Sequence, residues 1–127
     1  MPTLSLTIPA NAGVPNELRQ RLDRWLRLLD ADEGSRCDIV LAAWEACVNA
    51  MEHAGSSEPI RVHAYAKDSG VCIRIEDSGR WLERRGASCG TRGHGLTIMR
   101  KLMHRVEIDR RNDGTSLLLC RNLARAT

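Results

Sequence analysis

The sequence predicts an α/β two-layer sandwich, in which helices cover one face of a mixed, mainly antiparallel sheet. Alternation of apolar and polar residues, which is typical of half-buried strands, occurs over residues 3–8, 60–67, 71–77, 106–108 and 115–121. Apolar residues recur at helical spacing over residues 15–29, 35–54 and 95–103. A chain of 127 residues can bury one hydrophobic core, so we expect a single domain over residues 1–127.

The first helix has one apolar and one basic face. A break rich in proline and glycine, residues 9–15, separates it from the first strand. The apolar face carries Leu18, Leu22, Trp25, Leu26 and Leu29, and the basic face carries Arg19, Arg21, Arg24 and Arg27. Such a basic face is either solvated or a docking surface for an acidic partner. This helix and strand 3–8 could also supply a homodimer interface.

The later elements are bounded by cap and turn residues. Ser35 is a candidate N-cap for the long helix, which Gly55 and two serines end after Ala54. Asp68-Ser69-Gly70 joins two strands as a hairpin, and Asn112-Asp113-Gly114 turns the chain into the last strand. The helix that begins near Gly95 follows a long segment without periodic pattern.

Composition excludes several classes of function. The net charge is only +3, there is no Phe and there is one Tyr, so a nucleic-acid binder that stacks bases is disfavoured. The start has no signal-peptide pattern, and no apolar run approaches the ~18 residues of a membrane helix. The five cysteines are scattered and never spaced C-x-x-C, so we expect reduced thiols in a cytoplasmic protein.

The long helix carries a polar line on an otherwise apolar surface. Glu45, Asn49 and His53 are spaced four residues apart and therefore share one face. Another face carries the apolar stripe Val40, Trp44, Cys47, Met51 and Ala54. The polar line is either a solvated edge or one wall of a polar pocket. In a pocket, the carboxylate and amide oxygens of Glu45 and Asn49 suit Mg²⁺, which takes further ligands from phosphates.

Two further features follow the long helix. Asp77 continues the apolar face of strand 71–77, so alternation turns its carboxylate toward the core. There it either accepts a hydrogen bond from a ligand or caps a local turn with Ser78 and Gly79. Residues 80–94 are basic and unpatterned, as in a functional lid, and Gly93-His94-Gly95 at a helix start is typical of an anion site.

Taken in chain order, these features resemble the Bergerat (GHKL) ATP-binding fold. Gyrase B, heat-shock chaperones of that fold, mismatch-repair ATPases and sensor histidine kinases share it. The matching motifs are E-x-x-x-N-A-x-x-H from Glu45 to His53, D-x-G from Asp77 to Gly79, and G-x-G-L from Gly93 to Leu96. The resemblance covers nearly the whole chain and implies ATP and Mg²⁺ as cofactors.

The resemblance also implies a role for each matched residue. Glu45 would act as a general base and Asn49 would coordinate Mg²⁺. Asp77 would accept a hydrogen bond from the adenine amino group, and Gly79 would let the purine approach the backbone. An arginine of the lid could supply charge to the phosphates. The remaining implied ATP contacts are Gly93, His94, Gly95, Leu96 and Thr115.

More narrowly, the chain is similar to the bacterial anti-sigma-factor serine/threonine kinases. The E-A-x-x-N-A-x-x-H motif, the short lid and Gly95-Leu96-Thr97-Ile98-Met99 carry this similarity. It implies binding of a sigma factor, or phosphorylation of a serine on an anti-anti-sigma (STAS-type) protein, with no direct role for nucleic acid or membrane.

Two alternatives stay open. A nucleotide-gated module could sequester partners without phosphorylating them. It is motivated by the short lid and by Trp81, which stands where the full motif has glycine. A fragment of a sensor histidine kinase is disfavoured, because helix 15–29 contains no histidine that could accept a phosphoryl group.

Overall fold

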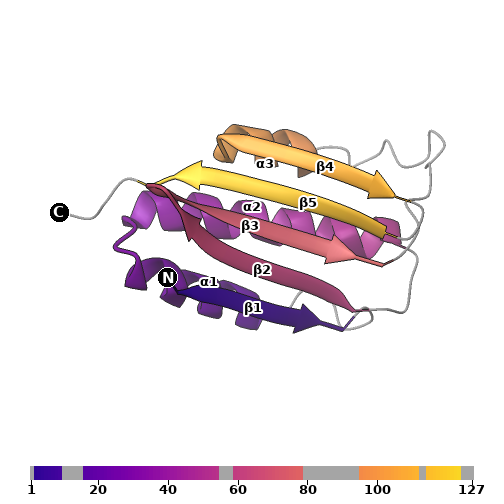
Figure 1. The fold of residues 1–127 in the computed structure, drawn as a ribbon, viewed down its shortest axis with the longest axis horizontal. Coiled ribbons are helices and arrows are strands. Elements are labelled where there is room, and N and C mark those ends of the chain that lie inside the picture. Colours follow the sequence, from indigo (N-terminus) through magenta and orange to yellow (C-terminus); the bar gives the residue numbers. More distant parts are fainter. Residues whose placement is uncertain (1, 10–15, 55–58, 79–94, 112–113, 124–127) are drawn as a thin grey trace.

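The computed structural model describes residues 2–9, 16–54, 59–78, 95–111 and 114–123, without the side chains of residues 53 and 54. Within these residues the chain folds into a sheet covered by helices (Figure 1). The elements in chain order are β1 (Thr3–Ile8), α1 (Asn16–Leu28), α2 (Glu33–Ala54), β2 (Ile60–Lys67), β3 (Gly70–Asp77), α3 (Gly95–Leu102), β4 (Arg105–Arg111) and β5 (Gly114–Asn122).

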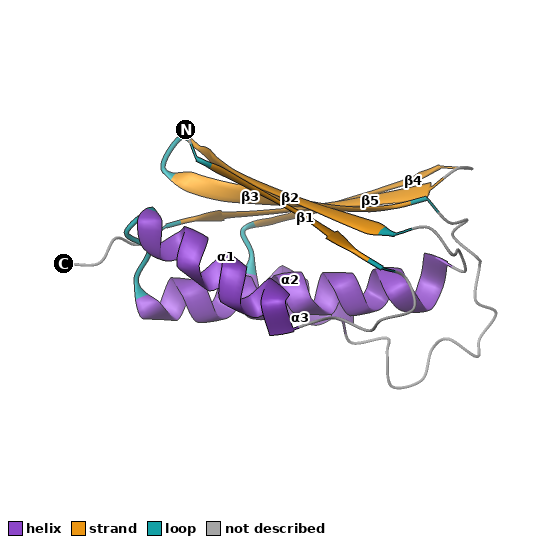
Figure 2. Ribbon diagram, turned by 90° about the horizontal axis from the view of Figure 1, so that it is seen from below, coloured by secondary structure: helices purple, strands orange, loops and turns teal. Residues whose placement is uncertain are grey.

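The strands form one sheet in the order β1-β2-β3-β5-β4, and each neighbouring pair is antiparallel. The helices lie on one face of this sheet, as Figure 2 shows from below. The predicted two-layer α/β sandwich is therefore confirmed. Strand β5 lies beside β3, although 36 residues of the chain, from 78 to 113, separate their ends.

The core lies between the helices and the sheet, and α2 runs through its middle. The most deeply buried face of α2 is built mainly from small side chains: Ile39, Ala42, Ala43, Ala46, Cys47 and Ala50. Small side chains let a helix approach the sheet closely. Of the expected stripe only Cys47 is fully buried among the described side chains, since Val40, Trp44 and Met51 lie at the margin of the core. The buried face of α2 is therefore rotated by part of a helical turn from the predicted stripe.

Helix α2 begins earlier than predicted. The Oδ1 atom of Asp32 accepts a hydrogen bond from the backbone N–H of Ser35 at 2.9 Å, so Asp32 is the N-cap and Ser35 already lies in the first turn. Ser35 is 2% exposed. Asp32 and Ser35 are both favourable N-cap residues, and in the folded chain Asp32 is the one that caps α2.

Two arginines form contacts between α1 and α2. Arg36 of α2 donates hydrogen bonds to Asp23 of α1 at 2.9 Å and to the carbonyl of Ala31 at 2.8 Å. The guanidinium of Arg19 lies over the ring of Trp44, 4.1 Å from its centroid. At least part of the predicted basic face of α1 therefore serves packing between α1 and α2.

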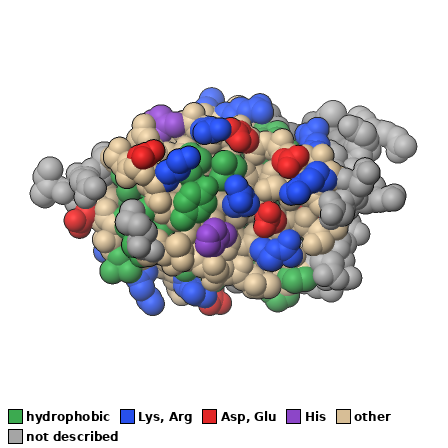
Figure 3. All heavy atoms as spheres, viewed as in Figure 1, with side chains coloured by type: hydrophobic (Ala, Val, Ile, Leu, Met, Phe, Trp, Pro, Cys, Tyr) green, Lys and Arg blue, Asp and Glu red, His purple; other side chains and the backbone are tan. Residues whose placement is uncertain are grey.

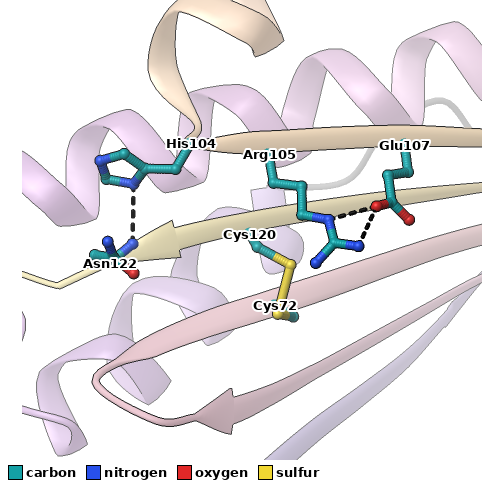
Figure 4. The surroundings of a disulfide bond; sticks show 6 residues. All are labelled: Cys72, His104, Arg105, Glu107, Cys120 and Asn122. Atoms are coloured by element: carbon teal, nitrogen blue, oxygen red, sulfur yellow. Dashed lines mark hydrogen bonds and ion pairs between the residues drawn. A yellow bond between two sulfur atoms is a disulfide. The ribbon is translucent and has the colours of Figure 1, made fainter.

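The prediction that all cysteines are reduced thiols is wrong for one pair. Cys72 of β3 and Cys120 of β5 are directly opposite partners and form a disulfide (Figure 4). Cys37 and Cys47 are free. The pairing depends on the register of two strands 48 residues apart in sequence, which cysteine spacing alone does not reveal.

Candidate functional site

One end of the molecule gathers the elements that carry the predicted site. The C-terminal end of α2, the C-terminal end of β3 and the start of β5 all lie at this end, and α3 starts on the same side (Figure 1). Figure 2 shows from below how α2 runs along the sheet to this end. The predicted residues Glu45, Asn49, Asp77, Gly95 and Thr115 belong to these segments.

Helices α2 and α3 meet where Glu45 faces Gly95. The Oε1 atom of Glu45 lies 3.7 Å from the point that a Cβ atom on Gly95 would occupy, and Met99 Cε lies 3.9 Å from it. Gly95 is buried and Glu45 is half-buried. The first N–H groups of a helix carry partial positive charge, so the carboxylate lies beside the positive end of α3.

Asn49 lies one turn along α2 from Glu45 and is also half-buried. The four-residue spacing places both side chains on one helix face. Leu96, the second residue of α3, is half-buried and packs against the core. A carboxylate and an amide thus lie on the C-terminal half of α2, and the carboxylate lies beside the start of α3.

Across the sheet, Asp77 and Thr115 are directly paired on β3 and β5. Both are buried, with exposures of 7% and 4%. This confirms the expectation that strand alternation turns Asp77 toward the core. Within the described part of the chain, the Oγ1 atom of Thr115 has no hydrogen-bond partner. A buried hydroxyl without a partner costs about 1–3 kcal/mol, which a ligand or a water molecule can relieve.

Gly114 makes this pairing possible, a role that the sequence analysis missed. A Cβ atom at Gly114 would lie 2.2 Å from the carbonyl oxygen of Asp77, so no larger residue fits without backbone movement. In the sequence Gly114 follows Asn112-Asp113 and is explained as a turn residue, which hides its packing role. It brings the backbones of β3 and β5 into close contact beside Asp77.

Three predicted ATP contacts, Gly79, Gly93 and His94, lie outside the described residues, as do the arginines of the lid. The side chain of His53 is outside them as well. In the described part of the chain, no group of three or more His, Cys, Asp or Glu residues could hold a metal ion. In that same part, the helices are all too short or too polar to cross a membrane.

The described residues suit a nucleotide in three respects. A buried carboxylate and a buried hydroxyl lie side by side at Asp77 and Thr115, where a hydrogen-bonding ligand group would satisfy the hydroxyl. Asn49 offers an amide oxygen, a ligand type that Mg²⁺ accepts beside phosphate oxygens. The start of α3 offers N–H groups to an anion.

Residues 8–121 match the model of the histidine kinase-like ATPase domain family. The chain therefore belongs to this family of ATPase domains. Its match covers the elements from the end of β1 to β5, including every site residue named above.

Solved structures agree with this assignment. The chain aligns over its full length with a structure containing the RsbU and RsbW domains of Rv1364c from Mycobacterium tuberculosis, at 27% identity and a TM-score of 0.81. It spans 33% of that longer chain. A blue-light activated histidine kinase from Erythrobacter litoralis matches 84% of this chain and 65% of its own, at 19% identity and a TM-score of 0.59. The catalytic domain of histidine kinase ThkA matches at 17% identity and a TM-score of 0.59. This match covers 99% of this chain and 100% of the ThkA chain. The last two show the fold alone.

Proposed function

We propose that this chain is a cytoplasmic serine/threonine protein kinase of the anti-sigma type, with residues 1–127 as one ATP- and Mg²⁺-dependent domain. The observation that carries the proposal is the placement of Glu45 against the start of α3, with Asn49 one turn away. The full-length match to a structure that contains an RsbW domain supports this subclass over a histidine kinase.

The adenine end of the proposed site is the pair Asp77 and Thr115. The carboxylate of Asp77 would accept a hydrogen bond from the adenine amino group, and Thr115 would support Asp77 or a bridging water. Gly79 would let the ring approach the backbone. Because Asp77 and Thr115 are buried, their hydrogen bonds discriminate well between bases.

The phosphate end lies between α2 and α3. Asn49 would supply the protein oxygen for Mg²⁺, and the phosphates would supply other ligands, as this ion commonly requires. The N–H groups at Gly93, His94, Gly95 and Leu96 would hold the phosphates at the positive end of α3. ATP, when bound there, supplies the phosphoryl group for transfer.

Glu45 would act on the acceptor. A general base takes the proton of the attacking hydroxyl, and it must lie within hydrogen-bond reach of that hydroxyl. Glu45 of α2 is half-buried, and its carboxylate lies beside Gly95, the first residue of α3. This position suits a carboxylate that meets a serine presented by another protein.

The proposed partners are a sigma factor and a STAS-type anti-anti-sigma protein, in line with the RsbW domain of the matched structure. The test incubates the chain with labelled ATP, Mg²⁺ and a candidate STAS-type protein. We expect label on a serine of the partner, and transfer slowed by about 10²–10⁴-fold in Glu45→Gln while ATP binding persists.

Equal labelling by the wild type and Glu45→Gln would refute the role of Glu45 as base. ATP binding without transfer to any STAS-type protein would instead favour the alternative, a nucleotide-gated module that sequesters its partner. Exposed Glu52, further along the same helix, offers a matched control: Glu52→Gln should transfer at the wild-type rate.

A further inference from the structure

The face of the sheet that the helices leave uncovered carries a pair of cysteines. Cys72 and Cys120 are directly opposite each other on β3 and β5, with their Cα atoms 4.1 Å apart. Their neighbours Ile73 and Leu119 are fully buried in the core, so alternation turns both sulfur atoms to the opposite face. Figure 3 views the molecule from this side, and Figure 4 shows the bond.

A cavity reaches the pair from solvent. Its volume is about 280 Å³, and both cysteines line it together with Lys67, Asp68, His104 and Arg105. Cys72 is 6% exposed, and Cys120 is half-buried. A small molecule can enter such a cavity, whereas a thiol on the surface of another folded protein cannot easily reach Cys72. Lys67 and Arg105 bring positive charge to the cavity, and Asp68 and Glu107, the ion-pair partner of Arg105, offset part of it.

We propose that Cys72 and Cys120 form a reversible redox site that exchanges with low-molecular-weight thiols through this cavity. The thiolate of a small thiol attacks one sulfur of the pair. A mixed disulfide forms, the Cys72–Cys120 bond breaks, and the released cysteine thiolate takes a proton from water. A second small thiolate attacks the mixed disulfide, which frees the other cysteine and releases a small-molecule disulfide.

This exchange is balanced, because two electrons pass from two small thiols to the protein disulfide. The reverse sequence uses the small-molecule disulfide as oxidant and restores the bond. The other two described cysteines differ in access. Burial raises the pKa of the Cys47 thiol to about 12, which keeps it protonated, and Cys37 is exposed on α2 without a cysteine partner.

The bond has a structural consequence for the strands that carry Asp77 and Thr115. These two residues are paired five positions further along the same two strands, from 72 to 77 and from 120 to 115. The disulfide fixes the register of β3 against β5, and the close contact of Gly114 with Asp77 depends on that register. Oxidation therefore stabilises the folded sheet that presents the proposed adenine site.

The test equilibrates the folded wild-type protein with mixtures of reduced and oxidised glutathione, quenches with acid, alkylates and analyses peptides by mass spectrometry. We expect the linked Cys72–Cys120 peptide to form and disappear reversibly as the glutathione ratio changes. We also expect the melting temperature to be higher in the oxidised protein by about 10 °C, as for a disulfide that closes a long loop.

Cys37→Ser is the matched control and should keep both responses, whereas Cys72→Ser and Cys120→Ser should lose both. Complete alkylation of Cys72 and Cys120 at every glutathione ratio in the folded wild type would overturn the proposal. A Cys72→Ser protein whose melting temperature still rises by about 10 °C on oxidation would also overturn it. None of these readouts involves ATP, so this proposal and the proposed kinase function stand or fall separately.

Discussion

The carboxylate of Glu45 lies against the first residue of α3, with Oε1 3.7 Å from the position of a Cβ atom on Gly95. That distance is an ordinary van der Waals contact, so a single methyl group fits there without a clash. The contact joins the two helices on which the proposed phosphate and acceptor sites lie.

The first prediction follows from this contact. Gly95→Ala should fold with stability within about 0.5 kcal/mol of the wild type. Gly95→Val should lose about 1–3 kcal/mol, because its extra methyl groups press on Glu45 or Met99. Urea unfolding measures both. Equal stability of the two variants would show that α2 and α3 are further apart than described.

A second prediction concerns two glycines in contrasting surroundings. Gly114→Ala should destabilise the fold by about 2–4 kcal/mol, because its Cβ atom would lie 2.2 Å from the carbonyl oxygen of Asp77. Gly34→Ala in α2 has no heavy atom within 4 Å of the new Cβ atom and should stabilise by about 0.5–1 kcal/mol. Chemical denaturation of both variants gives the comparison, and effects of the same sign would refute the described approach of β5 to β3.

A third prediction separates stability from binding at Thr115. Thr115→Val keeps the shape but removes a buried hydroxyl that has no partner in the described structure, so stability should stay equal or rise by up to about 1 kcal/mol. Affinity for ATP should fall by about 5–10-fold, the loss of one hydrogen bond. Thr7→Val, on an exposed position of β1, is the control and should leave ATP affinity unchanged. Unaltered affinity in Thr115→Val would remove Thr115 from the adenine site.

A fourth prediction concerns acid stability. A hydrogen bond from Arg27 lowers the pKa of Asp23 below its ordinary value of 3.8, and a hydrogen bond from Arg36 lowers it further. A depressed pKa in the folded state gives stability that is present above the unfolded pKa and is lost as pH falls through the folded one. Asp23→Asn should therefore be less stable than the wild type at neutral pH, and the difference should shrink below about pH 4. Thermal melts across pH 2–7 test this, and a constant difference would contradict it.

Local patterns predicted the fold because β1 and β2 alternate between buried and more exposed residues, and α1 and α3 each have one apolar face. They failed where tertiary contacts decide. Asp32 and Ser35 are both favourable N-cap residues by type. The structure uses Asp32, and Ser35 is buried in the first turn of α2. Predicting the disulfide would have required the strand order, in which β5 lies between β3 and β4.

The candidate site was predicted unevenly for similar reasons. Strand alternation correctly turned Asp77 inward, and helical spacing placed Glu45 and Asn49 on one face. Gly114 was predicted only as a turn residue, because its packing role depends on the backbone of a distant strand. The roles proposed for Gly79, Gly93 and His94 stay predictions, since these residues lie outside the described part of the chain.

The most direct test of the central claim is a calorimetric titration of the folded protein with ATP, with Mg²⁺ present or chelated, for the wild type and Asp77→Asn. We expect saturable uptake by the wild type that weakens at least about tenfold without Mg²⁺, and no measurable uptake by Asp77→Asn at an unchanged melting temperature. No uptake by the wild type, or equal uptake by both proteins, would contradict a magnesium-dependent ATP site between α2 and the sheet.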